Sequence, residues 1–361
     1  MLSAYGFPFL LAALVSYILT PYIKTLAFKI GAIDKPDNRK VHKKIMPRLG
    51  GLAIYIAFMI AAVASLELTK DIVGILLGGS VIAIVGVLDD KYQLPAKVKL
   101  LGQIFAACVL VAFDIRIEWL NNPFGGYFYL NEWFISIPLT IFWVISFTNV
   151  VNLIDGLDGL AAGVWVISFT NVVNLIDGLD GLAAGVSAIA SMTVILVAVQ
   201  MGYYHIAVMT AALAGGIIGF IRYNFNPATI FMGDTGSMFI GYMLAAISVY
   251  GAVKTAATVA LIVPAIALGL PIMDTAFAIM RRYSNGRPIF QPDKGHLHHR
   301  LLAMGMNQKQ AVLLMYAITA VLGIAAVLWA EFDGFYAALI IAVIITAVAV
   351  GAKKIGILND R

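Results

Sequence analysis

Long apolar runs alternate with short polar segments along the whole chain. An α-helix rises 1.5 Å per residue, so about 20 apolar residues cross a ~30 Å hydrocarbon core. The runs that meet this requirement cover residues 4–23, 49–66, 71–88, 98–115, 134–153, 187–201, 204–222, 236–252, 255–280, 310–329 and 335–352. The pattern therefore predicts an all-α polytopic membrane protein with about 11 transmembrane helices.

The composition agrees with this fold class. Of the 361 residues, 61% are hydrophobic and 12% are charged, and the mean hydropathy is +0.94. Because soluble domains carry about a quarter charged residues, the soluble class is excluded. We expect one integral-membrane domain over residues 1–361. The first apolar run lacks preceding basic residues and a small-residue cleavage site, which predicts a retained first span.

Lysine and arginine are strongly biased toward alternate polar segments. Of the 24 such residues, 21 fall in 24–48, 91–99, 281–309, 353–361 or at Arg222, and three fall in the other loops. Positive charge stays on the cytoplasmic side, so the N-terminus is expected outside and the C-terminus inside. The net charge of +5 thus reflects topology and an anionic ligand, and no nucleic-acid partner is expected.

The loop at residues 118–133 is aromatic and lies on the predicted outer side. Its Pro-Phe-Gly-Gly sequence is typical of a turn. A short hairpin and a simple aromatic belt at the membrane interface are both consistent with it.

Asp89 and Asp90 end the span 71–88 on the predicted cytoplasmic side. Two adjacent carboxylates at a helix C-terminus repel each other and oppose the helix dipole. A bound divalent cation next to the lysines of 91–99 would offset that cost. A solvated helix end is the alternative interpretation.

Two further polar clusters are predicted on the same side. Asn224, Asn226 and Asp234 surround the start of the span 236–252, where an ordinary helix cap is the alternative. The loop 281–309 contains His296, His298 and His299 together with Lys294 and Arg300. The H-x-H-H spacing lacks the ligands of a zinc site, so phosphate binding is favoured over zinc, with an ordinary surface loop as the alternative.

The three clusters together have the groups that Mg²⁺ and a diphosphate require. Mg²⁺ is usually held by one or two protein carboxylates and by substrate phosphates. Catalysis at such a site depends mainly on positioning and on charge stabilisation. We therefore predict cytoplasmic catalytic loops.

Four motifs, in order, resemble those of the polyprenyl-phosphate N-acetylhexosamine-1-phosphate transferases. They read VLDDKYQLPAKVKLLGQ, NVVNLIDGLDGLAAG, NFNPATIFMGDTGS and PDKGHLHHRL, within roughly residues 34–302. The sequences DKPDNRKVH, MPRLGG and H-x-H-H are most similar to the branch that starts teichoic acid linkage units or related surface glycans. The phospho-MurNAc-pentapeptide translocases usually have three consecutive histidines and a Thr-Pro-Thr loop instead.

The resemblance implies a reaction and a set of ligands. A GlcNAc-type sugar 1-phosphate would pass from a UDP-sugar to undecaprenyl phosphate, with release of UMP, as the first step of cell-surface glycopolymer synthesis. Mg²⁺, or Mn²⁺ in its place, is the implied cofactor. The implied location is the bacterial plasma membrane, and a homodimer is left open. A transferase for the peptidoglycan precursor and, in a different class, a secondary transporter are the alternatives.

The resemblance also implies roles for individual residues. The implied catalytic residues are Asp89, Asp90, Asp234, His298 and His299. The implied substrate-binding residues are Lys44, Lys99, Asn224, His296, Lys294, Arg300, Asp155, Asp158, Asp177 and Asp180. The implied metal ligands are Asp234, Asn149, Asn152, Asn171 and Asn174.

Residues 143–164 and 165–186 are identical, so the Asn-Asp motif occurs twice. In a continuous helix, 22 residues span about 33 Å, so one site cannot use both copies. A single extra crossing would place Asp234 and the histidines outside, which the charge bias excludes. We expect one copy in the site and the other displaced, with a preference for the second copy because it leads directly into the next span. A recent tandem duplication or a sequence assembly error explains the identity.

Overall fold

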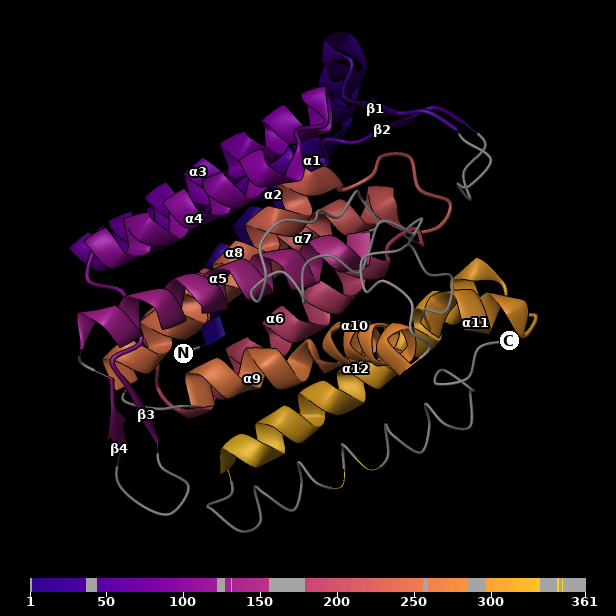
Figure 1. Ribbon diagram of the computed structural model, residues 1–361. Helices are drawn as coiled ribbons and strands as arrows, with labels where there is room; N and C mark the ends of the chain where they lie inside the picture. The colour runs from indigo at the N-terminus through magenta and orange to yellow at the C-terminus, as the bar shows by residue number, and fades with distance from the viewer. Residues whose placement is uncertain are drawn as a thin grey trace.

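The computed structural model describes residues 2–36, 44–121, 127–130, 132–155, 179–255, 259–284 and 297–331, together with 343 and 346. Long helices packed side by side dominate these residues (Figure 1). Seven of the described helices are long and apolar enough to cross a membrane. The protein is thus an all-α polytopic membrane protein, as the hydropathy pattern predicts.

The helices agree closely with the predicted spans. They are α1 (Leu2–Ile30), α2 (Gly51–Ser65), α3 (Lys70–Tyr92), α4 (Ala96–Ala112), α5 (Trp133–Asp155), α6 (Leu182–Gln200), α7 (Tyr204–Asn224), α8 (Gly233–Thr255), α9 (Val259–Ala267), α10 (Gly269–Ser284), α11 (Leu297–Ala303) and α12 (Gln308–Glu331). The last predicted span, 335–352, lies outside the described residues except for 343 and 346.

Helix α8 forms the centre of the bundle. In the 18-residue apolar stretch of α8, 94% of the residues are buried, whereas 28% are buried in the corresponding stretch of α1. Small residues allow other helices to approach α8 closely. A Cβ atom on Gly241 would come within 2.5 Å of the Phe147 carbonyl oxygen of α5, and one on Gly86 would come within 2.4 Å of Thr235. These contacts fix α3 and α5 against α8.

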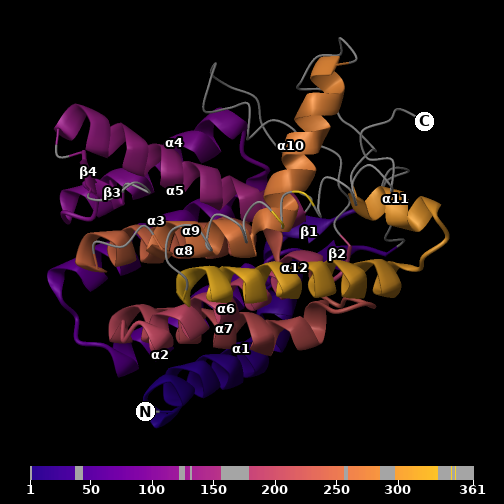
Figure 2. The ribbon, with the colours of Figure 1, turned by 90° about the horizontal axis from the view of Figure 1, so that it is seen from below.

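The predicted span 255–280 is two helices in the structure. α9 ends at Ala267 and α10 begins at Gly269, and α10 turns away from the other helices (Figure 2). Pro271 lies in the first turn of α10, where backbone N–H groups have no intrahelical partner and proline is tolerated. The apolar pattern does not reveal this break, because residues 259–273 form one uninterrupted apolar run across it.

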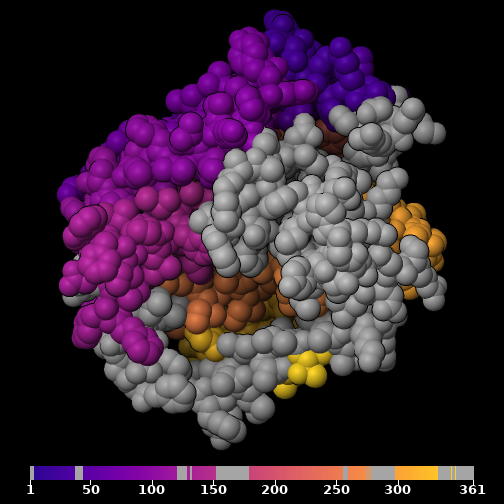
Figure 3. All heavy atoms as spheres, viewed as in Figure 1, coloured from indigo at the N-terminus to yellow at the C-terminus, as the bar shows by residue number. Residues whose placement is uncertain are grey.

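Two short antiparallel sheets lie at opposite ends of the bundle (Figure 1). Strands β1 (Ile33–Asp34) and β2 (Met46–Pro47) pair at one end. Strands β3 (Trp119–Asn121) and β4 (Tyr127–Tyr129) pair at the other end, which confirms the hairpin interpretation of the aromatic loop. In the space-filling view, the N-terminal part of the chain (indigo to magenta) covers the top and the left side of the face shown (Figure 3).

Candidate active site

Three carboxylates and two cations meet at the end of the bundle that carries β1 and β2. Asp89 and Asp90 come from the last turn of α3, Lys99 from the first turn of α4, and Asp234 from the first turn of α8. Arg48 precedes α2. Each of the five residues is at most 6% exposed. We refer to these five residues as the charged cluster.

Lys99 connects two of the carboxylates. Its Nζ atom lies 3.1 Å from Asp89 Oδ2 and 2.8 Å from Asp234 Oδ2. The remaining oxygens, Asp89 Oδ1 and Asp234 Oδ1, are buried and have no hydrogen-bond partner among the described residues. Lys99 therefore satisfies one oxygen of each carboxylate and leaves the other without a donor.

Asp90 has a different environment from its neighbour. Its Oδ1 atom accepts a hydrogen bond from the backbone N–H of Asp234 at 2.9 Å, and its Oδ2 atom accepts two from Thr235. Arg48 Nε donates to the same carboxylate at 3.4 Å. Because first-turn N–H groups lack intrahelical partners, Asp90 stabilises the start of α8 and thereby positions Asp234.

Arg48 balances part of the negative charge. Burial alone would lower the pKa of Arg48, but the carboxylates of Asp90, Asp234 and Asp89 outweigh it and raise the pKa above its ordinary value. Arg48 therefore stays charged. Three carboxylates and two cations leave the cluster with one formal negative charge.

A layer of amides lies one helical turn deeper. Gln103 follows Lys99 by four residues, and its side chain exchanges two hydrogen bonds with Asn149 of α5, at 3.1 and 2.8 Å. Gln103 Nε2 also lies 3.5 Å from the sulfur of Met238, four residues after Asp234. This layer connects α4, α5 and α8 beneath the charged cluster.

The segment before Asp234 is held on two sides. Asp180 Oδ2 accepts hydrogen bonds from Asn226 Nδ2 at 3.0 Å and from the backbone N–H of Ala228 at 2.9 Å. Asn224 Nδ2 donates to the carbonyl of Ile230 at 3.1 Å. Phe231 pairs with the β2 segment through a hydrogen bond from its N–H to the Pro47 carbonyl. The basic loop is thus joined directly to the Asp234 segment.

His298 and His299 lie in α11, at the same end of the bundle (Figure 1). His298 is 1% exposed, and its ring centroid is 4.2 Å from that of His299. The backbone N–H of Leu297 donates to Asp274 Oδ1 of α10 at 3.0 Å. The sequence reasoning missed Asp274, although an acid within an apolar span is a signal of function.

The other predicted residues are placed as follows. Lys44 is exposed, and Arg300 is half-buried in α11. Asn152 and Asp155 belong to α5, but their side chains are outside the described set. Asp158, Asn171, Asn174, Asp177, Lys294 and His296 lie outside the described residues.

The far end of the bundle has different chemistry. The three cations that the charge bias leaves on the predicted outer side each pair with an acid: Lys70 with Asp114, Arg116 with Glu118, and Lys254 with Asp71. The Lys70 ammonium lowers the pKa of Asp114 below its ordinary value.

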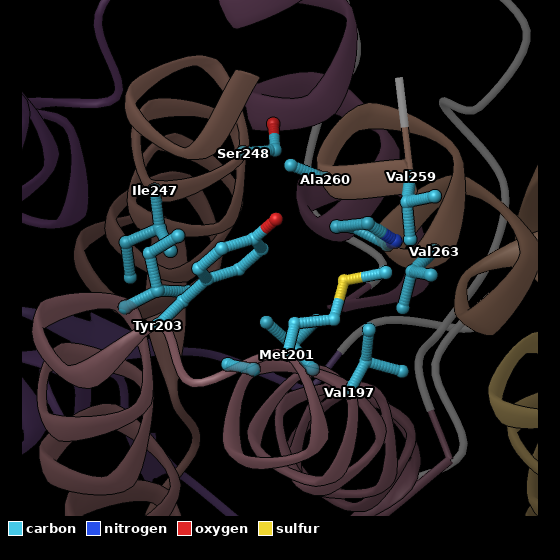
Figure 4. A pocket seen from close by; sticks show the side chains of 12 residues that line it. Val197, Met201, Tyr203, Ile247, Ser248, Val259, Ala260 and Val263 are labelled. Carbon is cyan, nitrogen blue, oxygen red and sulfur yellow. The ribbon is translucent and has the colours of Figure 1, made fainter. Parts of the chain in front are cut away.

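An apolar pocket between α6, α8 and α9 lies away from the charged cluster. Met201, Tyr203, Ile247 and Val263 line it (Figure 4). Its polar lining includes the hydroxyl of Ser248, which accepts a hydrogen bond from the Trp143 indole. Ile247 follows Asp234 by 13 residues on α8, which is about 20 Å along the helix, so the pocket is separate from the charged cluster.

The fold and the site define a helical membrane protein with a buried acid–base cluster at one end of its bundle. The family model described as glycosyl transferase family 4 matches residues 72–169 and 163–252, so that each match includes one copy of the repeat. The chain belongs to this family. The family resemblance seen in the four motifs is confirmed.

Curated relatives extend over nearly the whole chain. A probable undecaprenyl-phosphate N-acetylglucosaminyl 1-phosphate transferase of Bacillus subtilis is 39% identical, over 98% of this chain and 92% of its own length. A decaprenyl-phosphate N-acetylglucosaminephosphotransferase of Mycolicibacterium smegmatis is 36% identical, over 94% and 86%. A phospho-N-acetylmuramoyl-pentapeptide-transferase of a Thermoanaerobacter species is 29% identical, over 86% and 95%.

Proposed function

We propose that the protein transfers N-acetylglucosamine 1-phosphate from UDP-N-acetylglucosamine to undecaprenyl phosphate and releases UMP. The names of the relatives with 39% and 36% identity support this activity. The observation that carries it is the buried Asp89–Lys99–Asp234 arrangement at one end of a membrane-spanning bundle. A soluble nucleotide and a membrane lipid can meet at such a place.

The proposed chemistry needs no covalent intermediate on the protein. An oxygen of the lipid phosphate attacks the β-phosphorus, a new P–O bond forms, and the bond to the UMP oxygen breaks. A phosphate monoester has its second pKa near ~6, so the lipid phosphate is already mostly dianionic at neutral pH. Asp89 and Asp234 then place the reacting groups, and no side chain has to remove a proton from the nucleophile.

The residues of the charged cluster fit a magnesium ion. Asp89 Oδ1 and Asp234 Oδ1 are buried without hydrogen-bond partners, and the cluster has a formal negative charge. Within the described ranges, no group of three or more His, Cys, Asp or Glu side chains could hold a metal by itself. Two carboxylates completed by substrate phosphates are the usual magnesium arrangement. Bound Mg²⁺ would neutralise charge on the diphosphate.

Asn149 was predicted as a metal ligand, but its amide oxygen accepts a hydrogen bond from Gln103. We therefore assign it a positioning role beneath the charged cluster. Lys99 holds the two carboxylates together, and Arg48 fixes Asp90. His298 and His299, at the same end of the bundle, are the proposed contacts for the sugar or diphosphate.

The orientation is also part of the proposal. We place the charged cluster on the cytoplasmic side of a bacterial plasma membrane, with the N-terminus outside. The segments predicted to be cytoplasmic contain 21 of the 24 lysines and arginines, which supports this orientation. The three exceptions form ion pairs at the opposite end of the bundle.

The peptidoglycan-precursor activity is the second candidate, since a relative of that name is 29% identical. Purified protein with Mg²⁺ and undecaprenyl phosphate distinguishes the two. We expect UMP release with UDP-N-acetylglucosamine and a lipid-diphosphate-GlcNAc product in the mass spectrum. Release of UMP only with UDP-MurNAc-pentapeptide would contradict the proposal.

A further inference from the structure

The described parts of the two repeat copies lie in different helices. Residues 143–155 of the first copy form the second half of α5. Residues 179–186 of the second copy form the turn before α6 and its first residues. The two helices contact each other, and the end of α5 and the start of α6 lie at the end of the bundle with the charged cluster.

The first copy supports α8 just after Asp234. Asn149 is 8% exposed and exchanges hydrogen bonds with Gln103, which lies against Met238. Phe147 of the same copy approaches α8 so closely that only a glycine fits at position 241. These contacts position α8, the helix of Asp234, against α4 and α5.

The second copy supports the segment just before Asp234. The Asp180 carboxylate accepts hydrogen bonds from Asn226 and Ala228. The next residue, Gly181, has a φ of +82°, and its carbonyl accepts a hydrogen bond from the Tyr316 hydroxyl at 2.5 Å. A Cβ atom on Gly185 would overlap the Tyr316 ring, so α12 fixes this turn.

We infer that the site is composite: Asn149 of the first copy and Asp180 of the second copy are the functional pair, and their identical counterparts Asn171 and Asp158 are not required. Asn149 and Asp180 hold the two sides of the Asp234 segment. The inference rests on the proposed function of that segment. It also implies that the reaction does not need residues 156–177, a segment with the length of one repeat copy.

The repeat itself supplies matched controls. We compare Asn149→Ala with Asn171→Ala, and Asp180→Ala with Asp158→Ala, in purified full-length protein. Asn149→Ala and Asp180→Ala should lower the thermal unfolding midpoint by several degrees, because the first leaves the buried Gln103 amide without its partner and the second removes two half-buried hydrogen bonds. They should also reduce UMP release at least about tenfold. The two counterpart variants should match the wild type in both measurements.

A deletion variant tests the same inference from the other direction. Removing residues 156–177 gives the same sequence as removing either whole copy. The shortened protein should keep at least the wild-type rate of UMP release and the wild-type unfolding midpoint. A loss in both would overturn the composite site.

The role of Asp180 needs a measurement that general destabilisation does not change. Asp180→Ala should raise the Mg²⁺ concentration at half-maximal rate severalfold, because the Asp234 segment loses its support. Partial recovery of the wild-type requirement in Asp180→Asn, which keeps one acceptor oxygen, is the expected rescue. Loss of folded protein alone would lower the rate without shifting the Mg²⁺ requirement.

The outcomes separate this inference from the proposed function. If the wild type releases no UMP but the unfolding midpoints show the expected asymmetry, the proposed function fails and the composite site stands. If the wild type is active but Asn171→Ala and Asp158→Ala are as damaging as their counterparts, the composite site fails and the proposed function stands.

Discussion

The ammonium of Lys99 lies between the carboxylates of Asp89 and Asp234, 3.1 Å from one and 2.8 Å from the other. Lys99 lies in the first turn of α4 and Asp234 in the first turn of α8, so the contact joins two residues that are 135 positions apart in the sequence. One buried cation thus holds two acids near each other, while the second oxygen of each acid has no hydrogen-bond donor among the described residues.

Lys99→Met should abolish activity and destabilise the fold. Removing one partner of a buried ion pair leaves uncompensated charge and costs about 3–5 kcal/mol. The control is Lys97→Met, because Lys97 is exposed two residues away on the same helix. UMP release and thermal unfolding in detergent measure both effects, and an active, stable Lys99→Met protein would contradict the account.

The two adjacent aspartates should respond differently to substitution. Asp90→Ala removes three hydrogen bonds to the start of α8 and the contact with Arg48, so it should cost about 3 kcal/mol of stability. Asp89→Asn should keep the fold and lower kcat at least about tenfold. Unfolding curves and initial rates of both variants check this difference. A phospho-aspartate trapped on Asp89 in the wild type would overturn the proposed direct displacement.

Asp274 should act through the position of α11. Asp274→Asn keeps an oxygen that accepts the hydrogen bond of the Leu297 N–H, whereas Asp274→Leu does not. We expect near wild-type rates for the asparagine variant and a loss of about tenfold for the leucine variant. Since α11 carries His298, the KM for the UDP-sugar should change in Asp274→Leu. Equal rates for the two variants would remove Asp274 from the site.

Removal of divalent cations should stop the reaction without unfolding the protein. EDTA should abolish UMP release, and added Mg²⁺ should restore it, with Mn²⁺ as a partial substitute. Because Arg48 and Lys99 already pair with the three carboxylates, the unfolding midpoint should change by only a few degrees. Full activity in EDTA would contradict the proposed use of the Asp89 and Asp234 oxygens.

The sequence predicted the fold class and several members of the site for clear physical reasons. Acids within apolar sequence are costly, so Asp89, Asp90 and Asp234 were recognisable as candidates without any structure. The charge bias separated Lys99 from Lys254, and the structure places them at opposite ends of the bundle.

Other features depend on tertiary contacts that no local pattern contains. Arg48 belongs to the basic segment 24–48, and the charge bias alone does not indicate that it pairs specifically with Asp90. Gln103 is a single amide in an apolar run, and only its partner Asn149 reveals its role. The sequence favours the use of one whole repeat copy, which stays a prediction because residues 156–178 lie outside the described part of the chain, and the composite site is the competing proposal.

The most direct test of the charged cluster as the place of phosphate transfer is the rate of UMP release in Asp234→Asn. The matched control is Asp71→Asn, an acid near the start of α3 that pairs with Lys254 at the far end of the bundle. Both proteins are purified in the same detergent and given UDP-N-acetylglucosamine, Mg²⁺ and undecaprenyl phosphate. The account predicts a loss of at least about a hundredfold for Asp234→Asn and a near wild-type rate for Asp71→Asn. Comparable rates for the two variants would contradict it.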